Sequence, residues 1–265
     1  MKRSTFTALT GAIAGMVATR AFAADSVGSQ ATPHGVQRVA MVIYPGMTAL
    51  DMIAPQLIFA ALGNTDVQLV WKDRTVVLTD TGVPIVPTAA FDEIASGLTV
   101  LFVGGGGGPD SFSVMNDPKV VGFLQRVGPS AEYVTSVCTG ALILGGAGLL
   151  RGYRATTHWV VHDLLATLGA TPVSERVVVD RNRITGAGVT AGLDFGLQMA
   201  AKLRGDDYAR MLQLMFEYDP QPPFNAGSEA KAGPQIAGEV QANFAPLVAG
   251  LKKNAGIAQA RLATS

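Results

Sequence analysis

Cys138 is the only cysteine of the chain, and it lies where an apolar segment changes into one rich in small residues. Tyr133–Val137 is typical of a buried strand, and Thr139–Leu144 opens a helix directly after the cysteine. Such a sharp turn exposes a nucleophile at the C-terminal edge of an α/β sheet. The helix start also favours a thiolate over a thiol. Cys138 is therefore either a catalytic nucleophile or a buried structural residue, the commonest role of a free cysteine.

Five consecutive glycines, Gly104–Gly108, follow another apolar segment, Val100–Val103. Glycine permits positive φ and lets backbone N–H groups approach a ligand closely. The phosphate-binding Walker pattern is absent because no Gly-Lys-Ser or Gly-Lys-Thr follows. We expect no proper helix to open at Pro109 and Asp110, which argues against a dinucleotide motif. The favoured interpretation is an oxyanion cradle facing Cys138, and a plain flexible loop is the alternative.

Asp51 is a carboxylate among apolar residues, shortly after the first apolar segment, Val39–Tyr44. An aspartate in this setting is either the N-cap of a helix or a functional acid. Capping is the more frequent reason for such a residue, so the sequence around Asp51 alone favours it.

His158 and His162 are one helical turn apart, a spacing that suits a metal ion. The segment between them lacks the glutamate of H-E-x-x-H, and no third ligand presents itself, so we expect no metal. His158 is then either a neighbour of the Cys138 thiol or a structural residue at a helix start.

Strand and helix patterns alternate around these residues, and Val76–Thr79 with Val83–Val86 reads as a hairpin. The other predicted strands are Val39–Tyr44, Val67–Trp71, Val100–Val103, Tyr133–Val137, Val177–Asp180 and Arg183–Thr185. The predicted helices are Asp51–Leu62, one that starts after Asp117 and Pro118, Thr139–Leu144, Trp159–Leu168, Ala191–Leu203 and Asp206–Phe216. Repeating βα units predict an α/β fold with a mainly parallel sheet and helices on both faces. The tail Asp219–Pro234 is rich in Pro, Gly and Asn and is expected to be irregular.

The N-terminus has the pattern of an export signal. Lys2 and Arg3 precede a mostly apolar run, Ala8–Ala18, and a small-x-small cleavage pattern ends at Ala23. The run is too short to span a bilayer as a helix. We therefore predict a signal peptide at residues 1–23, a flexible linker at 24–37, one catalytic domain at 38–265, and a periplasmic or secreted mature protein. The alternative is a frayed N-terminal helix of a cytosolic protein.

Composition narrows the classes of partner. The 265 residues carry a formal net charge of zero, whereas a nucleic-acid-binding surface needs clustered excess Lys and Arg. No basic amphipathic stretch indicates a membrane surface after the signal is removed. The single cysteine excludes an internal disulfide. These observations leave a small-molecule substrate as the expected partner.

The span from about Val39 to Pro234 resembles the ThiJ/PfpI superfamily, relatives of the class I glutamine amidotransferases, and within it the isonitrile hydratases. The motifs that carry the resemblance, in order, are YPGMTALDMIAP, GGGGGPD, SVCTGALILGGAGLLRGYRATTHW, TGAGVTAGLDFGL and EYDPQPPFNAGS. The resemblance implies a flavodoxin-like three-layer sandwich that is usually a homodimer and works without a cofactor.

The same resemblance implies roles for individual residues. Cys138 would be the nucleophile, with Asp51 as the carboxylate beside it. Thr139 follows the nucleophile, and Gly105 or Gly106 would donate backbone N–H groups together with Thr139. The implied reaction is hydration of an isonitrile to an N-substituted formamide, in which Asp51 carries the proton.

The chain also departs from neighbouring families. Peptidase-like members have His where this chain has Thr139, glutamine amidotransferases need a His-x-Glu dyad that is absent, and members with glyoxalase or deglycase activity usually have Glu in place of Asp51. The hydratases that this chain resembles are cytosolic, whereas we expect this protein to be exported. Two alternatives therefore stay open: a glyoxalase- or deglycase-like thiol enzyme with His158 as proton relay, and a non-catalytic exported redox or ligand-sensing protein.

Overall fold

The computed structural model describes residues 35–264. The predicted signal peptide and most of the predicted linker lie outside the described residues. Gln37, the last residue assigned to the linker, already belongs to the first strand.

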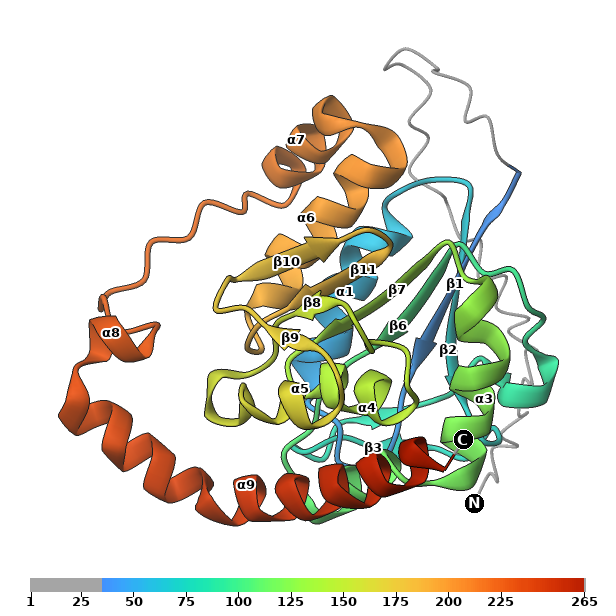
Figure 1. Cartoon of the computed structure of the whole chain (residues 1–265). Coiled ribbons are helices and arrows are strands. Elements are labelled where there is room, and N and C mark those ends of the chain that lie inside the picture. The colour runs from blue at the N-terminus through green and yellow to red at the C-terminus, as the bar shows by residue number, and fades with distance from the viewer. Residues whose placement is uncertain (1–34, 265) are drawn as a thin grey trace, which may run out of the picture. The chain divides into compact units, whose positions relative to one another are not determined.

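Within the described residues, seven strands form a central sheet in the order β10-β11-β7-β6-β1-β2-β5 (Figure 1). Their bounds are β1 Gln37–Val42, β2 Thr65–Trp71, β5 Ala89–Ala90, β6 Val100–Val103, β7 Tyr133–Val137, β10 Val177–Asp180 and β11 Arg183–Gly186. Neighbouring strands are parallel except for β10 and β11, which are antiparallel. This confirms the predicted mainly parallel sheet.

The register of the central strands brings their C-terminal ends to one edge. Val42 of β1 lies beside Val103 of β6, which in turn lies beside Ser136 of β7. Val137 of β7 pairs with Gly186 of β11. The segments that follow these strands therefore meet at the same edge of the sheet, which is where open α/β sheets bind ligands.

Helices cover both faces of the sheet (Figure 1). Their bounds are α1 Ala49–Ala60, α2 Pro109–Val114, α3 Pro118–Val127, α4 Gly140–Gly146, α5 Leu164–Thr167, α6 Ala191–Arg204, α7 Asp206–Met215, α8 Glu229–Ala232 and α9 Pro234–Ala263. Among residues 35–264, three short 3-10 helices complete them: η1 Phe91–Glu93, η2 Gly128–Ser130 and η3 Trp159–Val161. α1 packs on α6 and α6 on α7, whereas α4 packs on α5 and α9. This arrangement is the expected flavodoxin-like sandwich.

The core joins helices to the sheet through aromatic side chains. Phe102 of β6 lies 6.4 Å from Phe59 of α1 and 5.5 Å from Phe195 of α6, measured between ring centroids. All three rings are fully buried. Edge-to-face and tilted pairs of this kind add to the burial of apolar area. They fix α1, which carries Asp51, against the strand that leads into the glycine loop.

The smaller strands pair outside the central sheet. β3 (Val77–Leu78) and β4 (Pro84–Ile85) form the antiparallel hairpin expected from the sequence, and β8 (Arg154–Ala155) pairs in parallel with β9 (Thr171–Pro172).

Three expectations about helices were wrong. A helix, α2, does begin at Pro109 directly after the glycines, since proline suits the first position of a helix. The predicted helix Trp159–Leu168 is two short helices, η3 and α5. The tail Asp219–Pro234, expected to be irregular, contains the short helix α8. The 30 residues of α9 were given no prediction, because its glycines and internal Pro246 conceal the helical pattern. α9 is held by packing of side chains one turn apart, Leu247, Leu251, Ala255 and Ala258. No helix among residues 35–264 is long and apolar enough to cross a membrane.

Candidate active site

Cys138 lies on the turn between β7 and α4, with the backbone in the left-handed region at φ 57°. Its N–H donates to Ala187 O at 2.7 Å and Gly186 O at 3.1 Å. Its carbonyl accepts a hydrogen bond from Thr157 Oγ1 at 2.8 Å. Because a left-handed conformation is unfavourable for a non-glycine residue, it persists only where surrounding bonds hold it, and such residues cluster at functional sites. The structure therefore has the strained turn expected of a nucleophile elbow.

Asp51 is fully buried and does not cap its helix. The N-cap of α1 is Thr48, and Asp51 is the third residue of the helix. Its Oδ2 accepts a hydrogen bond from Gly105 N at 2.8 Å, a contact across 54 residues of sequence. Its Oδ1 is buried and has no hydrogen-bond partner among the nitrogen and oxygen atoms of the described residues. A buried carboxyl oxygen without a partner calls for an explanation, and a proton held or exchanged there supplies one.

The side chains of Asp51 and Cys138 are neighbours, and each shifts the pKa of the other. Burial raises the pKa of Asp51 from 3.8 to about 7, although the bonds from Gly105 and Cys138 act in the opposite direction. Burial also raises the pKa of the Cys138 thiol well above its ordinary value, and the Asp51 carboxylate raises it further. Two groups this close titrate as a pair. Near neutral pH the thiol therefore keeps its proton, while Asp51 is close to the midpoint of its titration.

The expected low pKa of the thiol was wrong. The Thr139 N–H at the start of α4 does hydrogen-bond the sulfur and lowers its pKa, but desolvation outweighs this contact. Only 5% of Cys138 is exposed. A thiolate therefore does not form here by spontaneous ionisation near neutral pH.

The glycine loop holds Asp51 and Thr139 in place. Gly105 N donates to Asp51, and Gly106 N donates to Thr139 Oγ1 at 2.9 Å, while the same hydroxyl donates to Gly106 O. A Cβ on Gly105 would lie 2.5 Å from Thr139 N and 2.8 Å from Asp51 Oδ2, so only glycine fits there. The N–H groups of Gly105 and Gly106, two of the three expected to serve an oxyanion, are thus engaged within the protein, and donation to substrate stays a prediction.

Tyr44 is a site residue that the sequence analysis missed. It follows β1, is fully buried, and its hydroxyl donates to Gly104 O at 2.8 Å. Burial raises the pKa of Tyr44, and the nearby Asp51 and Cys138 raise it further. The tyrosine therefore stays protonated and fixes the first carbonyl of the glycine loop. Its place directly after a buried strand was the available signal, since side chains at that position reach the ligand-binding edge.

His158 begins η3 and is partly buried. Its Nδ1 accepts from Val160 N at 3.4 Å, and its ring stacks on Phe244 of α9 at 5.6 Å between centroids. A side chain at Gly188 would meet the same ring. Burial lowers the pKa of His158, so the imidazole is neutral at neutral pH. His158 therefore has the structural role at a helix start that the sequence suggested as one alternative. The residues between 35 and 264 contain no cluster of three or more His, Cys, Asp or Glu placed for a metal.

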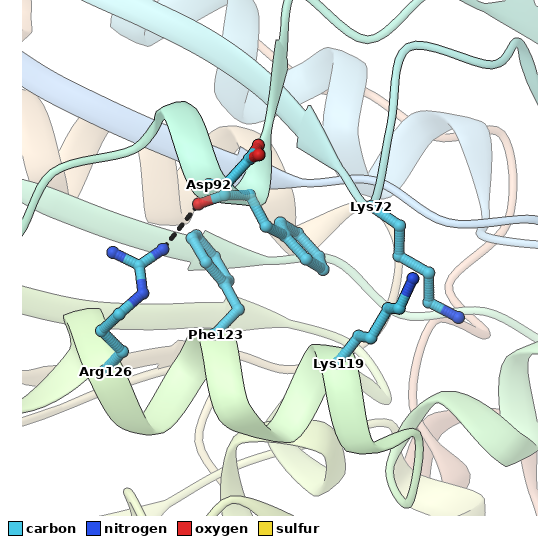
Figure 2. A pocket seen from close by; sticks show the side chains of 6 residues that line it. Lys72, Asp92, Lys119, Phe123 and Arg126 are labelled. Carbon is cyan, nitrogen blue, oxygen red and sulfur yellow. Dashed lines mark hydrogen bonds between the residues drawn. The ribbon is translucent and has the colours of Figure 1, made fainter.

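A separate hollow of about 350 Å³ contains none of these residues. Figure 2 shows Lys72 and Lys119 at one end of it and Arg126 at the other, with Phe123 between them. Lys72 pairs with Asp117, and Arg126 donates to Ile94 O at 2.7 Å. Lys72 and Arg126 are therefore already paired, and no cysteine lines this hollow, so Cys138 stays the candidate nucleophile.

The fold and site define an α/β sandwich with a single cysteine on a strand-to-helix turn and a buried carboxyl group beside it. The chain belongs to the DJ-1/PfpI family, whose model matches residues 37–202. It is 44% identical to isonitrile hydratase of Pseudomonas putida over 209 residues, which are 79% of this chain and 90% of that protein.

Other similar proteins are described by family alone or have other functions. A crystal structure of a ThiJ/PfpI family protein from Pseudomonas syringae is 45% identical and has a TM-score of 0.81, with 91% of this chain and 98% of that chain covered. The HTH-type transcriptional regulator GbdR of Pseudomonas aeruginosa is 33% identical over 142 residues, 52% of this chain and 37% of that protein. A deglycase of Thermococcus kodakarensis is 31% identical over 97 residues, 36% of this chain and 57% of that protein.

Proposed function

We propose that this protein hydrates an isonitrile to an N-substituted formamide, with Cys138 as the nucleophile and Asp51 as the proton carrier. The observation that carries the proposal is the pair itself: a buried carboxyl group with a pKa of about 7 beside the single thiol. Its 44% identity to an isonitrile hydratase over most of both chains supports the same reaction.

The first half of the reaction forms a thioimidate. The Asp51 carboxylate accepts the thiol proton, and the Cys138 sulfur attacks the terminal carbon of the isonitrile. Asp51 then gives the proton to that carbon, so the product R–N=CH–S–Cys138 contains all atoms of the isonitrile and the thiol. An ordinary aspartate, with a pKa near 3.9, is a poor donor at neutral pH, whereas a pKa near 7 suits both transfers.

The second half hydrolyses the thioimidate. The Asp51 carboxylate accepts a proton from a water molecule as the water oxygen attacks the carbon, and Asp51 then gives this proton to the nitrogen. The tetrahedral intermediate R–NH–CH(OH)–S–Cys138 collapses by breaking its C–S bond and releases R–NH–CHO, while its hydroxyl proton passes to the Cys138 sulfur. The reaction adds one water to the isonitrile, so a nucleophile and one mobile proton suffice.

Two further proposals concern the whole molecule. We propose that the chain is exported and cut after Ala23, on the pattern Ala21-Phe22-Ala23. Intact mass of protein recovered from its native host tests this, and an unprocessed N-terminus on soluble cytosolic protein would overturn it. We also propose a homodimer.

The test of function uses purified protein beginning at Ala24 with two substrates. Cyclohexyl isonitrile is expected to give N-cyclohexylformamide at a rate far above that of methylglyoxal consumption. Preferential turnover of methylglyoxal would instead support the deglycase-like alternative. Turnover of neither substrate would overturn the enzymatic proposal and favour a ligand or redox sensor.

A further inference from the structure

The β3–β4 hairpin is bound to the segment that leads into α1. Asp80, in the turn of the hairpin, donates its N–H to Met47 O at 2.9 Å. The next residue of the same segment, Thr48, donates its N–H to Gly105 O at 2.9 Å. The start of α1 is therefore bound to the hairpin at one residue and to the glycine loop at the next, so a side chain of the hairpin can act on the helix that carries Asp51.

Asp80 supplies the side-chain cap that α1 lacks. The N-cap residue Thr48 makes no side-chain hydrogen bond to the helix. Instead, Asp80 Oδ1 accepts from Ala49 N, the first N–H of α1, at 3.2 Å and across 31 residues of sequence. A carboxylate is favoured at this position because the unpaired N–H groups of a helix start carry a partial positive charge. The hairpin therefore holds a carboxylate at the end of α1 that contains Asp51.

Asp51 lies in the first turn of the same helix, where two effects on its carboxyl group oppose each other. The helix start stabilises an anion, whereas a second carboxylate at that end repels one and favours the protonated form. Burial is the largest cause of the raised pKa of Asp51, and the Asp80 carboxylate raises it further. Asp80 also raises the pKa of Tyr44, behind burial, Asp51 and Cys138. The charge of Asp80 thus reaches two buried groups of the site.

Other charged residues around α1 are paired or lie away from its first turn. Those on α6 and β2, the elements packed on α1, are Asp194, Lys202, Arg204 and Asp66. Asp194 pairs with Arg176, and Arg204 donates to Leu62 O, beyond the C-terminal end of α1. Lys202 is in the last turn of α6, and Asp66 is at the start of β2, whereas the site lies where the strands end. Asp80 is therefore the charge that faces the helix start beside Asp51.

We propose that Asp80 is a positioning residue of the hydration reaction, which caps α1 and places a negative charge where it helps Asp51 to hold the transferred proton. The proposal rests on the isonitrile hydratase function proposed above. Asp80 acts through Asp51 and needs no contact with the substrate. Without this charge, the Asp51 carboxyl group would lose its proton at a lower pH and would be a weaker base towards the thiol.

The test removes the charge and keeps the cap. Asp80→Asn and Asp80→Ser retain an oxygen that can accept from Ala49 N, because Asn and Ser cap helices about as well as Asp. Asp80→Glu retains the charge. Asp73→Asn is the matched control, since Asp73 is also exposed and its Oδ1 also accepts a backbone N–H, from Thr75 at 2.8 Å.

The expected result is a displaced pH profile for cyclohexyl isonitrile. One exposed charge shifts the pKa of a neighbouring group by on the order of half a unit, so we expect the pH midpoint of kcat/KM to fall by about that amount in the two neutral variants. The ratio of kcat/KM at pH 5.5 to that at pH 8.5 then rises about 3-fold. Asp80→Glu and Asp73→Asn are expected to keep the midpoint of wild type.

A merely structural cap gives a different result. It would lower the thermal midpoint of the neutral variants and leave their pH midpoint at the value of wild type, and this would overturn the proposal. An equal shift in Asp73→Asn would overturn it too, because the net charge of the protein would then be the cause. Two neutral variants are used so that misfolding of one leaves the other to decide.

A readout without substrate separates this inference from the function on which it rests. Titration of the Asp51 carboxyl carbon by ¹³C NMR is expected to show the same fall of midpoint in Asp80→Asn. This fall, combined with no isonitrile turnover by wild type, would support the effect of Asp80 on Asp51 and overturn the proposed function. An unchanged NMR midpoint in Asp80→Asn would overturn the role of Asp80 and leave the proposed function in place.

Discussion

The thiol of Cys138 and the carboxyl group of Asp51 are neighbours that shift each other's pKa, although one lies at the end of β7 and the other in the first turn of α1. Both are buried, and burial raises the pKa of each. Because the two share an environment without a neighbouring cation in contact, a proton taken from one is most easily held by the other. This pairing makes Asp51 the residue on which the proposed reaction depends most sharply.

Asp51→Asn is expected to abolish most turnover while leaving the fold intact. Asparagine keeps the shape and can still accept from Gly105 N, but it has no acid proton to exchange. General acid–base catalysis accelerates a reaction about 10²–10⁴-fold, so we expect the rate of isonitrile turnover to fall at least ~10²-fold. Steady-state formamide production measures it. Turnover near that of wild type in a well-folded Asp51→Asn protein would contradict the proton-carrier role.

The same variant has a stability signature. The folded pKa of Asp51 lies above its ordinary value, so its contribution to stability is fully present below about pH 4 and is lost as pH rises through about 7. A rise from 3.8 to about 7 corresponds to about 4 kcal/mol in total. We expect the free energy of unfolding of Asp51→Asn, relative to that of wild type, to increase by about 2–3 kcal/mol between pH 5 and pH 8.5. Denaturant unfolding at both pH values measures this difference, and a difference that does not change with pH would contradict the raised pKa.

The pH dependence of activity follows from the pair. The thiol proton must pass to the Asp51 carboxylate, so kcat/KM is expected to rise with pH, with a midpoint near 7. A fall is expected only at high pH, where the Cys138 thiol ionises and the mobile proton is lost. Iodoacetamide labelling of Cys138 should show a midpoint above the ordinary thiol value. An activity midpoint near pH 4, or a labelling midpoint below about pH 8.5, would show that burial does not govern the pKa values of Asp51 and Cys138.

Tyr44→Phe tests the support beneath the glycine loop. The change removes the hydroxyl that donates to Gly104 O and leaves that carbonyl without its buried donor. Such a loss costs about 1–3 kcal/mol of stability. Because the loop positions Asp51 through Gly105, we also expect kcat to fall several-fold with its pH midpoint displaced. A merely structural role would lower the thermal midpoint and leave the pH midpoint of kcat/KM unchanged.

The proposed homodimer has a candidate surface on α1. Leu50, Ile53 and Leu57 lie on one face of the helix and are 41–45% exposed, and the β3–β4 hairpin beside them exposes Leu78. Gly46 N donates to Leu78 O at 2.9 Å, so hairpin and helix start form one surface. Contiguous exposed apolar residues mark interfaces. We expect Leu57→Glu to convert a dimer into a monomer in light scattering, while Ile257→Glu does not; a monomeric wild type would overturn this assignment.

Most of the fold could be predicted from the sequence, because strands and turns depend mainly on residues that are neighbours in the chain. β6 and β7 have the predicted bounds, and the change of pattern at Cys138 marked the elbow. The role of Asp51 could not be predicted from its neighbours in the sequence, because its hydrogen-bond partner Gly105 is 54 residues away. The N-cap of α1, which the sequence favoured for Asp51, is Thr48. The direction of the thiol pKa was missed because burial, which outweighs the helix start, depends on packing of the whole chain.

Formamide production by wild type and by Cys138→Ala tests the central claim most directly. Both proteins begin at Ala24, and their thermal midpoints are compared first. Alanine removes the sulfur and leaves the carboxyl group of Asp51 in place, so no thioimidate can form. We predict N-cyclohexylformamide from wild type and none above the uncatalysed rate from Cys138→Ala. A Cys138→Ala protein that retains turnover within tenfold of wild type would contradict covalent catalysis through this residue.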